Sequence, residues 1–191
     1  MFSESNSAKT PLPDIAQPGQ AFATFAGGCF WCMQPPFDEI EGVLKTQVGY
    51  TGGPRPAPTY EQICTGATGH AEAIRITYDT SRVSYLDLLK TFWRNIDPTT
   101  KNRQFYDSGT QYRTSVFYHN EEQHQEAESS KSELEALGRF TSPIVTEIVP
   151  AAPFWEAEDY HQQYYVKCPL RYQSYSSGSG RKDYLKRTWE T

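Results

Sequence analysis

Two cysteines three residues apart, Cys29 and Cys32, are the side chains of this sequence best suited to redox chemistry. Gly27 and Gly28 precede them and follow a short apolar run, a pattern typical of a strand that turns sharply into a helix. The free N–H groups and the dipole at a helix start stabilise a thiolate. We therefore expect a reactive thiolate at Cys29, with Cys32 within one helical turn, where it could trap an oxidised sulfur.

Short apolar and alternating runs predict the elements that hold this pair. The predicted strands span residues 21–26, 43–50, 74–78, 114–118 and 144–149. Helices are predicted to begin at Cys29, after Ser84 and after Asn120, and another is predicted over 156–166. Pro35 and Pro36 lie inside the first helix, which should therefore be short or kinked.

This order of elements predicts a mixed sheet with helices packed on it, in an α/β or α+β domain. The 191 residues suit one domain, which we place at 21–191. Residues 1–20 are polar and proline-bearing, and predict a flexible N-terminal extension or a strap across the surface. Residues 174–180 are rich in Ser and Gly and predict a flexible, irregular C-terminal segment.

The composition excludes several classes of partner. The net charge is −5 and no basic patch runs along the chain, which argues against nucleic acid. No stretch approaches the roughly 20 apolar residues that a membrane span requires. Residues 1–20 lack the basic and apolar regions of a signal peptide, so a cytoplasmic protein is expected. In a reducing compartment, close cysteines indicate redox catalysis or metal binding.

Four segments resemble the A-type peptide methionine sulfoxide reductases. They are GCFW at 28–31, GYTGG at 49–53 with PTY at 58–60, GHAEA at 69–73 and DSGTQYR at 107–113. Their order and approximate spacing also match, and the resemblance covers about residues 21–175. The sequence departs from the commonest pattern at Cys32, where many members have glycine, and at Gln34, where many have glutamate. It is similar here to the subset that carries Cys-Phe-Trp-Cys.

The resemblance implies a two-layer plait of sheet and helices of ferredoxin-like type. It implies reduction of the S epimer of methionine sulfoxide, in peptides, in proteins or free, to methionine. The oxygen would pass to Cys29 as a sulfenic acid, a second thiol would close a disulfide, and thioredoxin or a similar dithiol would reduce it. No metal, flavin or nicotinamide site is evident, so no cofactor is expected.

Sulfoxide reduction needs an acid to protonate the departing oxygen, and Glu72 is the candidate that the resemblance also implies. It lies at the start of an apolar strand, where burial against aromatic side chains would raise its pKa and keep it protonated near neutral pH. Tyr60 and Tyr112 could donate hydrogen bonds to the sulfoxide oxygen. Asp107 could hold a water or the substrate backbone N–H.

The substrate methyl group requires an apolar slot. Phe30 and Trp31 directly follow Cys29 and would form that slot, with Tyr60 helping to line it. An apolar slot beside a cluster of polar groups could select one epimer of a chiral sulfur.

Two thiols compete for the resolving role. Cys32 is adjacent to Cys29 in sequence, whereas Cys168 lies ahead of the C-terminal segment, the region from which family members often supply a resolving cysteine. The choice stays open at this point. Cys64 lies in the long loop over 51–69 and is expected to be a bystander.

Three other classes of protein compete with this interpretation. A thioredoxin-like disulfide oxidoreductase would use Cys29 and Cys32 but leave Glu72 and Asp107 idle. A zinc module would need a second close pair of ligands, which the spacing of the four cysteines does not supply. An aromatic-rich module that binds peptides or sugars would need no reactive thiol.

Overall fold

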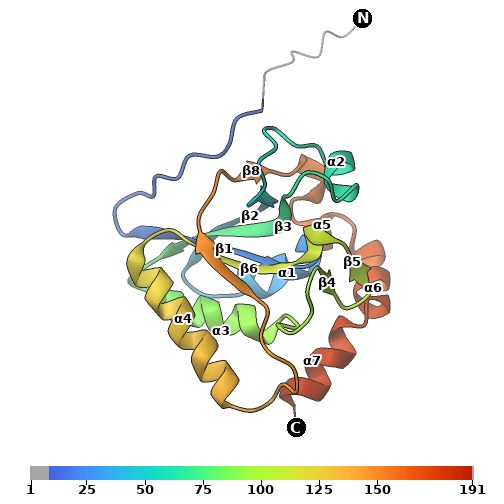
Figure 1. The fold of residues 1–191 in the computed structure, drawn as a ribbon. Helices are drawn as coiled ribbons and strands as arrows, with labels where there is room; N and C mark the ends of the chain where they lie inside the picture. Colours follow the sequence, from blue (N-terminus) through green and yellow to red (C-terminus); the bar gives the residue numbers. More distant parts are fainter. Residues whose placement is uncertain (1–8, 191) are drawn as a thin grey trace, which may run out of the picture.

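A six-stranded sheet is the centre of the computed structural model, which describes residues 9–190 (Figure 1). The strand order is β7-β6-β1-β3-β2-β8; β6 and β7 are parallel and the other pairs are antiparallel. The strands of this sheet are β1 (Gln20–Gly27), β2 (Val43–Thr51), β3 (Ala71–Asp79), β6 (Thr114–Tyr118), β7 (Glu147–Pro150) and β8 (Trp155–Glu156). Strands β4 (Arg103–Gln104) and β5 (Asp107–Ser108) form a separate small hairpin.

Helices cover one face of the sheet and close one end of it (Figure 1). The α-helices are α1 (Phe30–Asp38), α2 (Tyr60–Cys64), α3 (Tyr85–Arg94), α4 (Glu121–Ala136), α5 (Tyr164–Lys167), α6 (Pro169–Gly178) and α7 (Arg181–Trp189). Two 3₁₀ turns, η1 (Thr110–Tyr112) and η2 (Asp159–His161), complete the structure. The coarse prediction of a mixed α+β domain with a central sheet is confirmed.

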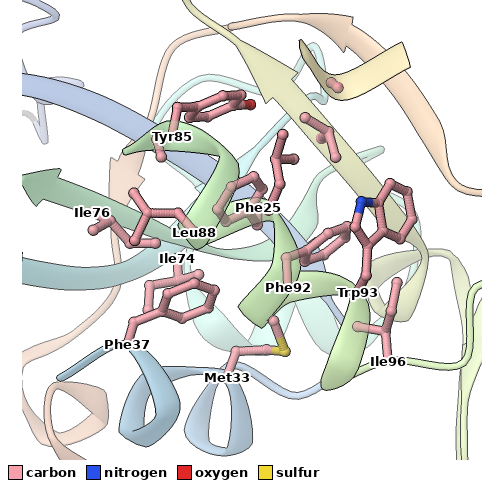
Figure 2. Packing of buried hydrophobic residues seen from close by; sticks show 14 of the residues in the cluster. Phe25, Met33, Phe37, Ile74, Ile76, Tyr85, Leu88, Phe92, Trp93 and Ile96 are labelled. Carbon is pink, nitrogen blue, oxygen red and sulfur yellow. The ribbon is translucent and has the colours of Figure 1, made fainter. Parts of the chain in front are cut away.

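The main core lies between the sheet and helices α1, α3 and α4. Figure 2 shows Phe37 of α1 and Phe92 of α3 directed toward Phe25 of β1. The rings of Phe25 and Phe92 stack with centroids 4.9 Å apart, and those of Phe25 and Phe37 lie 5.7 Å apart. Ile74 and Ile76 of β3 point into the same core (Figure 2), so Glu72, two residues earlier in the strand, faces the start of α1.

The opposite face of the sheet is covered by extended chain. Leu12 forms an isolated bridge to Phe154, and the Arg75 guanidinium donates to the carbonyl of Pro13. Residues 9–19 thus lie across the domain as a strap, while residues 1–8 of the predicted extension lie outside the described residues. In residues 9–190, no helix combines the length and the apolar character needed to cross a membrane.

Local sequence signals explain where the elements begin. Gly28 has φ +81° and an added Cβ would lie 2.5 Å from the Cβ of Gln104, so the turn into α1 requires glycine. Ser84 and Asn120 accept hydrogen bonds from the backbone of Asp87 and Gln123, which caps α3 and α4 as predicted.

Three predictions near the C-terminal end of the chain are wrong or shifted. The strand predicted over 144–149 is observed at Glu147–Pro150. The helix predicted over 156–166 is replaced by β8, η2 and the short α5, because the Gln162 side chain bonds both the N–H and the carbonyl of Val48 on the edge of β2. The predicted flexible, irregular segment over 174–180 is instead the end of α6 and a turn at Gly180 into α7.

Candidate functional site

Cys29 lies where β1 passes into α1, at the N-cap of the helix. Its side chain makes no capping hydrogen bond, and the residue is only 7% exposed. The first N–H of the helix, at Phe30, instead donates to Oε2 of Glu72 over 3.1 Å. This bond joins the carboxyl group of β3 to the turn that carries the thiol, and it satisfies one of the free donors of the helix start.

Glu72 is held in a strongly buried position. It pairs with Tyr50 across β2 and β3, and it is 2% exposed. Burial raises the pKa of Glu72 to about 8, although the Phe30 N–H and its bond favour the charged form. Glu72 is therefore mostly protonated at neutral pH, as expected from the sequence.

Cys29 and Cys32 form a hydrogen-bonded thiol pair inside the first turn of α1. Burial raises the pKa of Cys29 well above its usual range. The hydrogen bond with Cys29 lowers the pKa of Cys32 to about 7, and the positive charge of Arg181 acts in the same direction. Burial opposes the thiolate expected at Cys29, because the dipole of one short helix does not offset complete desolvation, and Cys32 is the easier of the two thiols to ionise.

Tyr60 and Tyr112 lie near the carboxyl group of Glu72 and belong to separate segments of the chain. Tyr60 begins α2 behind a capping box formed by Thr59 and Gln62. Tyr112 closes η1. Burial, and then the charge of Glu72, raise the pKa of both phenols, so both are neutral hydroxyl donors at physiological pH.

Phe30 and Trp31 take unequal positions. Phe30 is 1% exposed and packs against Tyr50 and His161. Trp31 is half-buried: its indole N–H donates to Nδ1 of His161 over 3.0 Å, and its ring stacks on Tyr164 at 3.9 Å between centroids. Trp31 therefore offers surface to a ligand, whereas Phe30 supports the site from beneath.

Asp107 faces a residue that sequence reasoning missed. The hydroxyl of Tyr175, on α6, donates to the Asp107 carboxylate and lies in hydrogen-bonding contact with Cys29. The ring of Tyr175 also meets Trp31 edge-on, with centroids 5.7 Å apart. Helix α6 thus covers the thiol pair with Tyr175, and we call this cover the roof. It lies in the segment whose Ser and Gly content predicted flexibility.

The two remaining cysteines lie apart from the pair. Cys168 is half-buried at the junction of α5 and α6, and its N–H bonds the Tyr164 carbonyl. Cys64 is exposed at the end of α2, and its thiol contacts the Tyr60 hydroxyl. None of the hydrogen bonds that involve Cys29 or Cys32, within residues 9–190, reaches Cys168.

Other positioning side chains were also missed. Glu158 accepts from the Tyr50 hydroxyl at 2.7 Å and from the Tyr60 N–H at 3.0 Å, and so fixes the start of α2. His161 orients Trp31, and burial lowers the pKa of His161 to about 4. Both lie in the segment predicted to be helical, and only the aromatic content of that segment hinted at a role. In the part of the chain that the structure describes, no cluster of three or more His, Cys, Asp or Glu side chains could hold a metal ion.

The raised pKa of Glu72 predicts a stability that depends on pH. An unfolded chain releases this proton near the ordinary glutamate pKa, whereas the folded chain keeps it up to about pH 8. The folded state therefore binds more protons in this window, and its stability falls as pH rises through it. Glu72→Gln removes this pH-dependent loss of stability. Between pH 5 and pH 8, the free energy of unfolding measured in urea should therefore rise by about 1–3 kcal/mol in the variant relative to the parent. The exposed Glu122→Gln is the control; a gap that does not change with pH would contradict the assignment.

Comparisons with known proteins agree with this geometry. Residues 21–191 match the family model described as "Peptide methionine sulfoxide reductase". A peptide methionine sulfoxide reductase MsrA of Bacillus licheniformis is 52% identical over 167 residues, which covers 87% of this chain and 92% of that protein.

Solved structures show the same fold. Methionine sulfoxide reductase A of Corynebacterium diphtheriae superposes with a TM-score of 0.73 at 33% identity, over 89% of this chain and 91% of the other. Mxr1 of Saccharomyces cerevisiae in complex with Trx2 superposes with a TM-score of 0.55 at 22% identity, over 78% and 88%. The family model spans nearly all of the described domain, and the chain belongs to the peptide methionine sulfoxide reductase family.

Proposed function

We propose that this chain reduces the S epimer of methionine sulfoxide through Cys29, with Glu72 as the acid. The observation that carries the proposal is the bond from the Phe30 N–H to Glu72, which sets a protonated carboxyl group beside the thiol at the start of α1. Family membership supports the same reaction. Free methionine sulfoxide and methionine sulfoxide in peptides or proteins are the proposed substrates.

In the first step the oxygen of the sulfoxide passes to the sulfur of Cys29. The sulfur of Cys29 attacks as its proton leaves, and that proton replaces the one that Glu72 gives up, so the charge of Cys32 is not used in this step. Glu72 gives its proton to the oxygen as the bond from sulfur to oxygen breaks. The products are methionine, now reduced, and a sulfenic acid on Cys29, now oxidised.

Substrate binding requires the roof to open. The Tyr175 hydroxyl occupies the polar space between Asp107 and Cys29, so the sulfoxide group must displace it. Tyr60 and Tyr112 then donate to the sulfoxide oxygen, and Asp107 accepts from the substrate backbone N–H or holds a water. The methyl group lies against Trp31, with Tyr60 completing the slot and Phe30 packed beneath it.

In the second step a thiol attacks Cys29 and water leaves. We propose Cys32 as the first resolving thiol, because it already contacts Cys29 and needs no loop to close. Cys168 would act at most as a second relay. The oxidised pair needs an external dithiol, for which thioredoxin is the proposed reductant; Mxr1 was solved as a complex with Trx2. A reducing compartment such as the cytoplasm supplies such a dithiol.

We also propose that residues 21–191 act as one catalytic domain of ferredoxin-like type. The alternation β1, α1, β2, β3, α3, β6 and the antiparallel order β6-β1-β3-β2 support a split βαβ plait. The flanking β7 and β8 and the helices α4 to α7 would be additions to that plait.

Replacing the nucleophile tests the function directly. Cys29→Ser should abolish reduction of methionine-S-sulfoxide, because a serine hydroxyl cannot accept the oxygen as a sulfenic acid. Release of methionine from a substoichiometric amount of the sulfoxide measures the effect, and Cys64→Ser is the matched control that should keep its activity. Near-normal release by Cys29→Ser would overturn the proposal, and so would equal turnover of the R epimer by the parent.

Glu72→Gln should slow the first step far more than it weakens binding, because the acid acts only while the bond from sulfur to oxygen breaks. Loss of a general acid costs roughly 10²- to 10⁴-fold in rate. Single-turnover formation of methionine, measured across substrate concentrations, separates the rate from the affinity. A change of less than about threefold would remove Glu72 from the mechanism.

Cys32→Ser and Cys168→Ser distinguish the two resolving thiols. With substrate and no reductant, Cys32→Ser should keep its sulfenic acid and lose most thioredoxin-driven turnover, whereas Cys168→Ser should close the Cys29–Cys32 disulfide at the parent rate. Mass mapping of disulfides after one turnover identifies the bond. Prompt formation of a Cys29–Cys168 bond with undiminished turnover in Cys32→Ser would assign the role to Cys168.

A further inference from the structure

A buried arginine from the last helix reaches the back of the thiol turn. Arg181 begins α7 and is 5% exposed. Its guanidinium donates to the Gly27 carbonyl at 2.8 Å, to the Asn95 carbonyl and toward the sulfur of Met33 at 3.4 Å. Met33 directly follows Cys32, and Gly27 lies two residues before Cys29. One fixed cation therefore lies behind both cysteines.

The charge of this arginine is not neutralised by its hydrogen-bond partners. All three of those partners are uncharged, and the face of the guanidinium lies 4.7 Å from the ring centroid of Phe105. A buried cation without a partner of opposite charge is costly. A negative charge nearby offsets that cost, and the thiol pair supplies one.

We propose that Arg181 is a positioning residue that holds the negative charge of the thiol pair on Cys32 and so prepares Cys32 to resolve the sulfenic acid on Cys29. This inference rests on the proposed function. It assigns to the C-terminal helix α7 a part in the second chemical step, beyond its packing on the domain.

The Cys32 thiolate attacks the sulfur of the Cys29 sulfenic acid, the bond between the two sulfurs forms, and the bond from sulfur to oxygen breaks. The oxygen leaves as hydroxide and takes the proton of Glu72 to become water. Cys32 is oxidised and the sulfenic sulfur is reduced, so the pair ends as a disulfide. A thiolate is the required nucleophile, so the rate follows the fraction of Cys32 that is deprotonated.

Several groups from four elements face the Cys32 thiol. Two favour its charge besides Cys29: Arg181 and the hydroxyl of Ser176 on α6. Asp107 of β5 opposes the negative charge on Cys32. That charge in turn raises the pKa of Glu72 on β3 and of Tyr172 on α6. Arg181 is the one cation in this set.

The first experiment titrates Cys32 alone. In a background of Cys29→Ser, Cys64→Ser and Cys168→Ser, Cys32 is the remaining thiol, and ultraviolet absorbance of the thiolate follows its ionisation. Arg181→Gln should move the midpoint upward, so that alkylation of Cys32 by iodoacetamide at pH 7 slows by about tenfold. Arg181→Lys keeps the charge and should titrate close to the background protein. Lys182→Gln removes the exposed neighbouring charge on α7 and is the matched control.

The second experiment follows one turnover in protein that retains Cys29 and Cys32. Arg181→Gln should release methionine within about twofold of the parent rate, then close the disulfide about tenfold more slowly at pH 7 and recover at high pH. A merely structural role would slow both steps together and would not respond to pH. Circular dichroism checks folding, and if Arg181→Gln does not fold, Arg181→Lys carries the test, because it loses the forked hydrogen bonds but keeps the charge.

The proposal is overturned if Arg181→Gln and Lys182→Gln titrate alike, or if Arg181→Lys raises the midpoint as much as Arg181→Gln. Failure of the proposed function gives a different result. In that case the parent releases no methionine from the sulfoxide, while the titration of Cys32 still reports on Arg181.

Discussion

The hydrogen bond from the Phe30 N–H to the Glu72 carboxyl group is the contact on which the rest of the site depends. It joins the central strand β3 to the turn between β1 and α1, and it does so inside the apolar face of the sheet. The strand provides the burial that keeps the acid protonated, and the helix start provides the donor that fixes its direction. A shift of either element by one residue would separate the acid from the thiol, because neighbouring strand positions point to opposite faces.

The features set by local sequence could be predicted. The two glycines before Cys29 indicated the turn, and the alternation over 74–78 predicted the strand at whose start Glu72 lies. The roof could not be predicted in this way. Tyr175 lies in the segment 174–180, whose Ser and Gly content favours disorder, and Arg181 directly follows it. Contacts with residues more than 60 positions earlier hold both of them. Long-range contacts of this kind override composition.

A long-range contact also explains why the helix predicted over 156–166 is wrong. The amide of Gln162 replaces a strand partner for Val48, so the chain follows the edge of β2 instead of coiling. The aromatic residues of that segment then pack around Trp31, as the stacking of Tyr164 shows. Periodicity along the sequence depends only on the spacing of such residues and carries no information about the sheet edge that they complete.

The roof over Cys29 also bears on how the protein survives the conditions under which methionine becomes oxidised. Peroxides oxidise cysteines that are both ionised and accessible. Here Cys29, the proposed nucleophile, has a pKa raised by burial and is only 7% exposed beneath Tyr175, so a small oxidant in solution meets a shielded, poorly nucleophilic thiol. A substrate that displaces Tyr175 exposes the sulfur of Cys29 only while that substrate is bound. Chemical selectivity between a bulky sulfoxide and a ubiquitous oxidant would then come from the energy of lifting one aromatic side chain.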